Sequence, residues 1–128
     1  MREPVRDRGR LEHIQTAINY ILSFTNGKTS DELATDKVLY FAVVKNIEII
    51  GEAAYKLSEP FRKQHSETPW PYIIKMRHVL VHDYYQISSR EVWKVINEDL
   101  APLASQIASY LSDIDWDAWE QQDFDYGK

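Results

Sequence analysis

Three residues near position 80 carry groups that could act together on a phosphodiester bond. Arg77, His82 and Tyr84 have the spacing R-x4-H-x-Y within the segment MRHVLVHDYY. An arginine can grip a phosphate through two parallel hydrogen bonds, and a histidine can move a proton near neutral pH. RNA brings its own nucleophile, the 2′-hydroxyl, so such a site needs no metal ion or other cofactor in principle. These residue types favour phosphodiester chemistry over acyl transfer.

The spacing of this pair constrains how a site can be built from it. A helix is expected from about Pro71 to His82, because proline is favoured at the first helical position. Arg77 and His82 are five residues apart, so on one straight helix they point about 140° away from each other. Either the helix ends between them and His82 swings back, or two copies of the segment meet across a two-fold axis and each site takes residues from both chains.

Other roles for the same residues remain open at this point. A histidine in the last turn of a helix is often a cap, and tyrosines often fill a core. His78 and His82 are four residues apart with Asp83 adjacent, a spacing that suits a metal ion. We expect no metal there, because no neighbouring residue in the sequence offers a further ligand.

Composition limits the remaining possibilities. The chain has 128 residues, 44% of them hydrophobic and 27% charged, which is ordinary for one soluble domain. It has no cysteine, which excludes disulfides, thiolate zinc sites and cysteine nucleophiles. The charged segment MREPVRDRGRLEHI does not resemble a secretory signal, and no apolar run is long enough for a membrane span. We therefore expect a cytoplasmic protein without a membrane partner.

Charge is distributed unevenly. The net charge is −5, and residues 113–128 hold six of the acidic residues and Lys128 alone among the basic ones. The rest of the chain is therefore neutral, which argues against broad, non-specific coating of a nucleic acid. Four aromatic residues alternate with these acids, so we expect a short amphipathic segment that packs its rings on the domain.

Apolar periodicity predicts an all-helical protein. Helices are expected over about 7–25, 33–58 and 71–82, and a fourth starts at Ser88–Ser89 and continues to about 111. A loop is expected over 60–68, Gly51 indicates a close backbone approach or a kink, and Pro102 predicts a bend. No segment alternates like a strand. We expect a four- to five-helix up-down bundle over residues 1–112, followed by the acidic, aromatic tail over 113–128.

These motifs occur in a wider context that resembles a known family. The segment WPYIIKMRHVLVHDYYQISSREVW resembles the signature of HepT-like proteins, in which a tryptophan precedes R-x4-H-x-Y and a V-W helix follows. The resemblance extends through VVKNIEIIGEAAYKLS to the pattern D-x-x-R-L-x-H-I that begins at Asp7. It covers roughly residues 7–112, and the combination is far more specific than the short motif alone.

The resemblance implies a fold, an activity and partners. HepT-like proteins are toxins of the HEPN class, helical and dimeric, and are encoded beside an MntA-type nucleotidyltransferase antitoxin. The resemblance therefore implies a two-fold homodimer of HEPN bundles that cleaves RNA as a metal-independent endoribonuclease. Arg77 and His82 match the catalytic pair, and Tyr84 matches the tyrosine that the antitoxin adenylylates. His78 replaces a polar residue, often asparagine, so His78 and Asp83 are expected only to support the site.

A function from another class is compatible with the same sequence. The chain could be a non-catalytic HEPN module that only docks a nucleotidyltransferase, and the neutral charge of residues 1–112 favours that reading. Cleavage of RNA by the purified protein distinguishes the two hypotheses.

Overall fold

The computed structural model describes residues 5–83 and 88–122, and for 79–83 it describes the backbone alone. The elements in chain order are α1 (Asp7–Thr25), α2 (Ser30–Thr35), α3 (Lys37–Lys56), α4 (Glu59–Gln64), α5 (Trp70–Asp83), α6 (Ser89–Lys94), the π-helical η1 (Val95–Asp99), α7 (Leu100–Asp113) and α8 (Trp116–Glu120). The described part of the chain holds no strand, so the predicted all-α class is confirmed.

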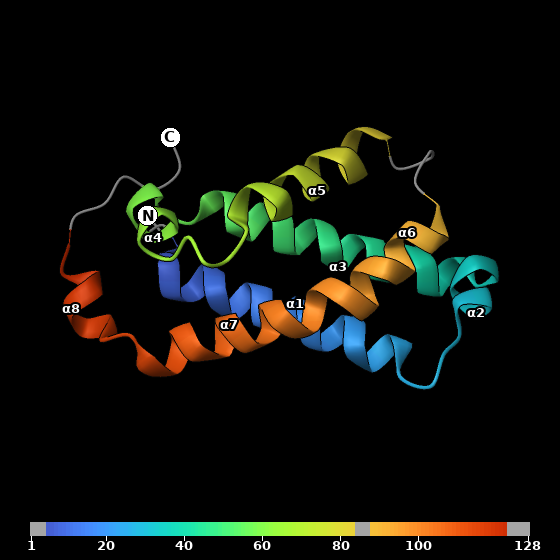
Figure 1. The fold of residues 1–128 in the computed structure, drawn as a ribbon, viewed down its shortest axis with the longest axis horizontal. Helices are drawn as coiled ribbons and strands as arrows, with labels where there is room; N and C mark the ends of the chain where they lie inside the picture. The colour runs from blue at the N-terminus through green and yellow to red at the C-terminus, as the bar shows by residue number, and fades with distance from the viewer. Residues whose placement is uncertain (1–4, 84–87, 123–128) are drawn as a thin grey trace.

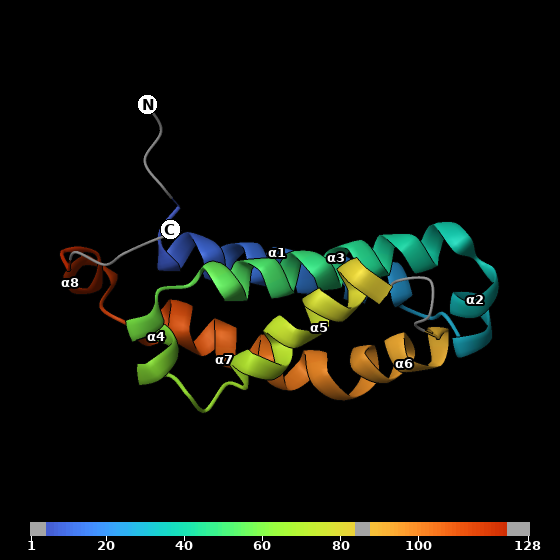
Figure 2. The same cartoon turned by 90° about the horizontal axis from the view of Figure 1, so that it is seen from above.

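The long helices form an antiparallel bundle (Figures 1 and 2). α1 and α3 run in opposite directions, α5 returns alongside α3, and α6, η1 and α7 form a continuous rod that runs back again. The short helices α4 and α8 lie at one end of the bundle and α2 at the other. This is the predicted up-down bundle. Within the described residues, no helix combines the length and apolar character that crossing a lipid bilayer requires.

The first helix has the predicted bounds. Its apolar residues recur at three- and four-residue steps, and four of them are almost fully buried: Leu11, Ile14, Ile18 and Ile21. Gly27 follows with φ 73°, a left-handed conformation that glycine adopts without a steric cost. The stripe and this glycine together set the length of α1.

The second predicted helix is interrupted. Thr29 and Glu32 form the predicted capping box, but the helix that they start ends at Thr35. The Asp36 side chain then accepts a hydrogen bond from the backbone N–H of Leu39 (3.1 Å), so Asp36 caps a new helix, α3. The prediction of a single helix over 33–58 is therefore wrong. The chain forms two helices there, because the Asp36 side chain caps a new helix instead of letting α2 continue.

A short helix replaces the first part of the loop predicted over 60–68. The Ser58 hydroxyl caps α4 by accepting from the backbone N–H of Phe61 (3.2 Å). Pro60 lies in the first turn, where its missing N–H has no intrahelical partner to lose. Pro60 therefore lies at the start of a helix, and the predicted loop is wrong over residues 60–64.

The fourth predicted helix is distorted, as Pro102 indicated, but the distortion lies N-terminal to the proline. Pro102 has no N–H for the Glu98 carbonyl, and its ring crowds that carbonyl. The preceding turn widens into η1, in which the backbone N–H of Leu100 bonds the carbonyl of Val95, five residues back. The rod thus continues through the proline.

The acidic tail contributes to the core as far as the structure describes it. Trp116 and Trp119 of α8 are only 6% and 7% exposed, and their rings stack on or meet Phe61 edge-on. Packing of these aromatic residues on the domain was the expectation from composition, and it is confirmed for these two. Phe124 and Tyr126 lie outside the described residues, and the division of the chain at residue 112 stays a prediction.

Candidate active site on helix α5

Helix α5 carries most of the predicted site residues. It begins at Trp70, one residue before the predicted start, and continues to Asp83. Arg77, His78, His82 and Asp83 all belong to it, whereas Tyr84 lies outside the described residues. The predicted catalytic pair therefore shares one helix.

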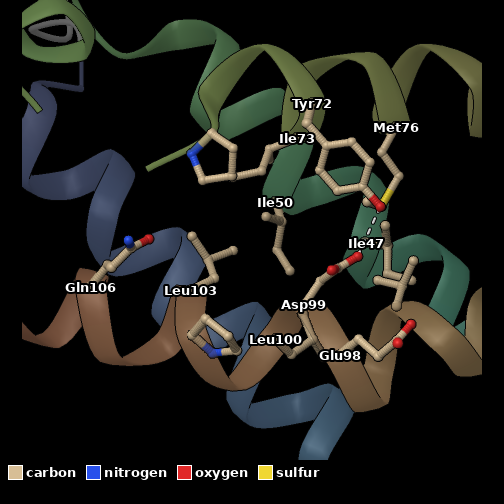
Figure 3. A pocket seen from close by; sticks show the side chains of 13 residues that line it. Ile47, Ile50, Tyr72, Ile73, Met76, Glu98, Asp99, Leu100, Leu103 and Gln106 are labelled. Atoms are coloured by element: carbon tan, nitrogen blue, oxygen red, sulfur yellow. Dashed lines mark hydrogen bonds between the residues drawn. The ribbon is translucent and has the colours of Figure 1, made fainter. Parts of the chain in front are cut away.

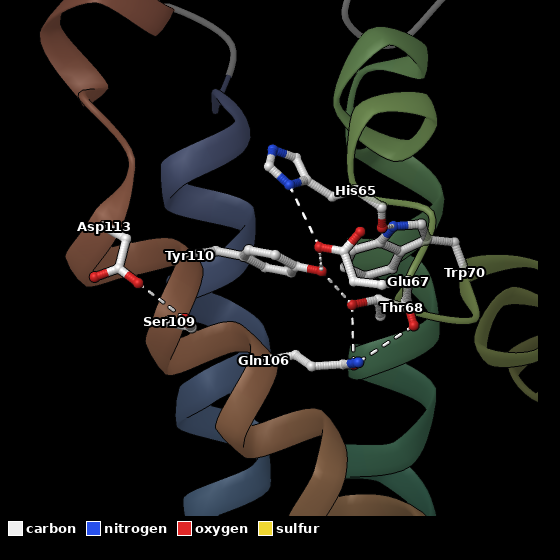
Figure 4. Close-up of polar contacts among 8 residues, drawn as sticks. All are labelled: His65, Glu67, Thr68, Trp70, Gln106, Ser109, Tyr110 and Asp113. Atoms are coloured by element: carbon white, nitrogen blue, oxygen red, sulfur yellow. Dashed lines mark hydrogen bonds and ion pairs between the residues drawn. The ribbon is translucent and has the colours of Figure 1, made fainter.

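A cluster of hydrogen bonds fixes the loop from which α5 starts (Figure 4). The Tyr110 hydroxyl donates to Glu67 Oε1 (2.9 Å), and the Thr68 hydroxyl contacts both Gln106 Oε1 (2.9 Å) and the Tyr110 oxygen, one of which accepts its single proton. Gln106 Nε2 donates to the backbone carbonyl of Glu67 (3.2 Å). Burial raises the pKa of Tyr110 to about 12; the hydrogen bond from Thr68 opposes this rise, whereas the hydrogen bond to Glu67 and its charge reinforce it. At neutral pH the Tyr110 phenol is therefore protonated and holds the loop onto α7.

Arg77 is positioned by a close contact between α3 and α5. A Cβ atom placed on Gly51 of α3 would overlap Arg77 Cβ and lie 3.1 Å from Arg77 Cα. No other residue type has room there, because every other side chain begins with a Cβ. The sequence indicated a close approach or a kink at Gly51 but gave no sign that Arg77 was its partner.

The Arg77 side chain is half-buried and has an unused hydrogen-bonding group. Its Nε is inaccessible to solvent and, within the described residues, has no hydrogen-bond acceptor. Buried donors are nearly always paired, so an unpaired one calls for an explanation such as a ligand. The buried Nε atoms of Arg10 and Arg62 also have no acceptor among the described residues, so this feature alone does not distinguish Arg77. A guanidinium donor without a protein acceptor can bind an anion such as phosphate.

The two histidines do not share the side of α5 that carries Arg77. The helix is continuous from position 77 to position 82, so these positions lie about 140° apart around its axis. The alternative in which the helix ends between them is therefore wrong. His78 is exposed, and position 82 lies on the same side of α5 as Lys75 and His78, which both face solvent.

The possibility of a metal ion at His78, His82 and Asp83 is not decided by the structure. Among the side chains that the structure describes, no three His, Asp or Glu residues are grouped to hold a metal ion. The side chains of His82 and Asp83 are outside that set. The absence of metal at this site stays a prediction.

Comparison with known proteins identifies a family that covers most of this chain. The sequence profile described as "Ribonuclease HepT-like" matches residues 14–123. The chain belongs to the HepT-like ribonuclease family. This confirms the family that the motifs around Arg77 indicated, and the predicted class of enzyme, an endoribonuclease, agrees with the family.

Two individual relatives of the HepT-like chain carry ribonuclease names. The protein named "Probable ribonuclease HepT" of Thermococcus cleftensis is 38% identical over 93 residues, which cover 73% of this chain and 84% of that protein. A protein of Caldanaerobacter subterraneus subsp. tengcongensis with a provisional RNase name is 35% identical over 104 residues, 81% of this chain and 93% of its own length.

A longer relative joins the HepT-like region to another activity. A protein of Methanocaldococcus jannaschii, named as a gamma-glutamylcyclotransferase and provisional RNase, is 34% identical over 105 residues. The match covers 82% of this chain and 47% of that protein, so the chain spans about half the length of this relative. No solved structure matches the chain.

Proposed function

We propose that this HepT-like chain is a cytoplasmic toxin, a metal-independent endoribonuclease in which Arg77 and His82 perform the cleavage. The observation that carries the proposal is the state of Arg77: it is held against Gly51, and its buried Nε has no acceptor among the described residues. Family membership supplies the class of reaction. RNA phosphate is the anion that both observations favour.

The reaction needs only groups that the chain and RNA possess. The RNA 2′-oxygen attacks the adjacent phosphorus while its proton passes to a base, a 2′-O–P bond forms and the P–5′-O bond breaks. The departing 5′-oxygen takes up a proton, which leaves a 2′,3′-cyclic phosphate and a 5′-hydroxyl. We assign proton transfer to His82 and stabilisation of the negative phosphoryl oxygens to Arg77.

The geometry of α5 favours a site shared between two chains. Positions 77 and 82 lie about 140° apart on a continuous helix, so one chain cannot readily direct both at one phosphate. In a two-fold dimer that pairs the α5 helices, Arg77 of one chain and His82 of its partner can face the same phosphate. A homodimer is therefore part of the proposal.

A cleavage assay with chelator tests the activity. Purified protein should cut tRNA or mRNA equally with and without EDTA and leave cyclic-phosphate ends. Arg77→Ala and His82→Ala should each remove cleavage without a large change in helicity or melting temperature, and His78→Ala should cost much less. The control is Arg8→Ala, since Arg8 is exposed on α1. Loss of cleavage in EDTA that zinc restores would assign His78 and His82 to a metal site instead.

The proposed antitoxin is an MntA-like nucleotidyltransferase that transfers AMP from ATP to the Tyr84 hydroxyl, which loses its proton while pyrophosphate leaves. The added phosphodiester carries a negative charge and would oppose RNA phosphate near Arg77. Mass spectrometry after co-expression should find one AMP on the peptide that contains Tyr84, and Tyr84→Phe should remove it while Tyr85→Phe should not. An unmodified Tyr84 in a neutralised complex would contradict this switch.

The neutral charge of residues 1–112 favours a second candidate, a non-catalytic module that docks the nucleotidyltransferase. That module would bind the nucleotidyltransferase but leave RNA intact at every protein concentration. The cleavage assay therefore decides between the two candidates.

A further inference from the structure

A cavity of about 160 Å³ lies between α3, α5 and the start of α7, on the side of α5 next to Met76 (Figure 3). Its walls are mostly apolar and come from these three helices and from η1. The main wall residues are Ile47, Ile50, Ile73, Met76, Leu100 and Leu103. Neither the motif around Arg77 nor the proposed reaction uses this cavity.

Two acidic residues of the π-helical turn line the same cavity. Glu98 and Asp99 are the last residues of η1, the turn that widens ahead of Pro102. The Tyr72 hydroxyl reaches across from α5 and donates to Asp99 Oδ2 (2.9 Å). Burial raises the pKa of Tyr72, and the hydrogen bond to Asp99 and the charges of both acids raise it further. π-helical turns of this kind are frequent at functional sites.

The negative charge at the cavity has little compensation within the described protein. None of the described residues that line the cavity is a lysine, arginine or histidine. Lys94 approaches Glu98 at 3.9 Å, and their side chains are 73% and 58% exposed. An ion pair this long and this exposed contributes little. A cation from outside therefore finds two carboxylates, whereas an RNA phosphate would be repelled.

The size of the cavity limits its occupant. Sites for drug-sized ligands enclose roughly 300–1,000 Å³, and this cavity is smaller. An apolar cavity of about 150 Å³ holds a group the size of benzene. One leucine, methionine or phenylalanine side chain has this size, and a few residues seated in well-packed pockets supply most of the binding energy of protein interfaces. Tyr72, 50% exposed, extends the contact surface beyond the cavity.

We propose that this cavity receives one apolar side chain of a partner polypeptide that carries a lysine or arginine beside it. The apolar side chain occupies the space between Ile50, Ile73 and Leu103. The neighbouring cation pairs with Glu98 and Asp99. This surface recognises protein, and Arg77 is not among the residues that line it.

Short peptides test the proposal directly. Protein with ¹³C-labelled isoleucine and leucine methyl groups is titrated with N-acetyl-Lys-Leu-amide and observed by NMR. The methyl signals of Ile47, Ile50, Ile73 and Leu103 should move, with weak affinity, as one anchor residue implies. Two control peptides should bind at least about fivefold more weakly. N-acetyl-Glu-Leu-amide lacks the cation, and N-acetyl-Lys-Ser-amide lacks the apolar side chain.

Matched variants separate charge from apolar contact. Glu98→Gln with Asp99→Asn keeps the shapes and an acceptor for Tyr72 but removes both charges, so it should reduce the affinity for the Lys-Leu peptide to that for the Glu-Leu peptide. Glu12→Gln with Asp117→Asn makes the same change in net charge at exposed positions on other helices and should leave binding unchanged.

Three results would overturn the proposal. The first is equal binding of the Lys-Leu and Glu-Leu peptides, and the second is that only methyl groups outside the cavity shift. The third is that free 3-methylbutylammonium binds as tightly as the Lys-Leu peptide. The last result would assign the cavity to a small amine. The readout is binding, so it does not depend on ribonuclease activity.

Discussion

Gly51 of α3 and Arg77 of α5 meet so closely that a methyl group on Gly51 would overlap the Arg77 Cβ. The contact joins two neighbouring helices at the position of the proposed catalytic arginine. The position of Arg77 therefore depends on the absence of a side chain on another helix. A glycine inside a helix usually lowers its stability, and here the close approach explains its presence.

Gly51→Ala tests this relationship. Helix propensity alone predicts that alanine stabilises α3 by about 0.5–1 kcal/mol. The overlap with Arg77 should reverse the sign and cost roughly 1–3 kcal/mol, measured by urea unfolding. Cleavage by the folded protein should fall roughly 10- to 100-fold, because a displacement of about 1 Å at a catalytic group has effects of this size.

Gly27→Ala is the control for Gly51→Ala. Gly27 has φ 73° and no neighbouring atom within 4 Å of an added Cβ, so alanine there should cost about 1–2 kcal/mol through backbone strain alone. Its cleavage rate per folded molecule should equal that of the parent. Unchanged stability and cleavage in Gly51→Ala would show that α3 and α5 can move apart without affecting Arg77, and would contradict the role of this contact.

Asp7 should be a main determinant of stability at the end of the bundle that holds α8. Its buried carboxylate accepts from the Ser58 backbone N–H (2.7 Å), the Ser58 hydroxyl (2.6 Å) and Trp119 Nε1 (2.9 Å). Asp7→Ala leaves these donors without this acceptor and should cost about 3 kcal/mol or more in urea unfolding. Trp119→Phe removes one of the three bonds and should cost less. Asp117→Ala, at an exposed position of α8, should change stability by less than about 0.5 kcal/mol; an equal loss there would contradict the role of Asp7.

Stability at alkaline pH should depend on Tyr110. Its pKa is raised to about 12 in the folded protein, against about 10 for an unperturbed tyrosine. A raised folded-state pKa means that the protonated phenol stabilises the fold below about pH 10 and that this contribution disappears between about pH 10 and 12. Tyr110→Phe should therefore flatten the fall in unfolding free energy over this range. Tyr55→Phe, at an exposed position, should leave the slope unchanged, and equal slopes for parent and Tyr110→Phe would contradict the expected linkage.

The parts of the fold that the sequence predicted are those governed by local pattern. The apolar stripe and Gly27 defined α1, and Trp70 with Pro71 defined the start of α5. The break at Asp36 was missed because the apolar stripe fits one long helix as well as two shorter ones. A single capping hydrogen bond, from the Leu39 N–H to Asp36, decides for two. The helix at Ser58 was missed because Pro60 can either end a helix or begin one.

The sequence predicted which residues could act in the site but not the contacts that position them. The motif placed Arg77 on a helix, and family resemblance gave it a role. The contact with Gly51 joins residues 26 positions apart, which periodicity cannot reveal. The cavity beside Met76 left no signal either, because its acids Glu98 and Asp99 are ordinary on a helix surface until a π-helical turn places them at an apolar space.

The central claim is that Arg77 of one chain and His82 of its partner act on the same RNA phosphate, and mixing two inactive variants measures it. Arg77→Ala and His82→Ala proteins are each assayed alone, then unfolded together, refolded and assayed on the same RNA. Half of the randomly paired dimers contain both variants, and each of these holds one intact site of two, so the mixture should recover about one quarter of the parent's activity. A mixture that stays inactive, although both proteins refold and the parent cleaves, would contradict a site shared between chains.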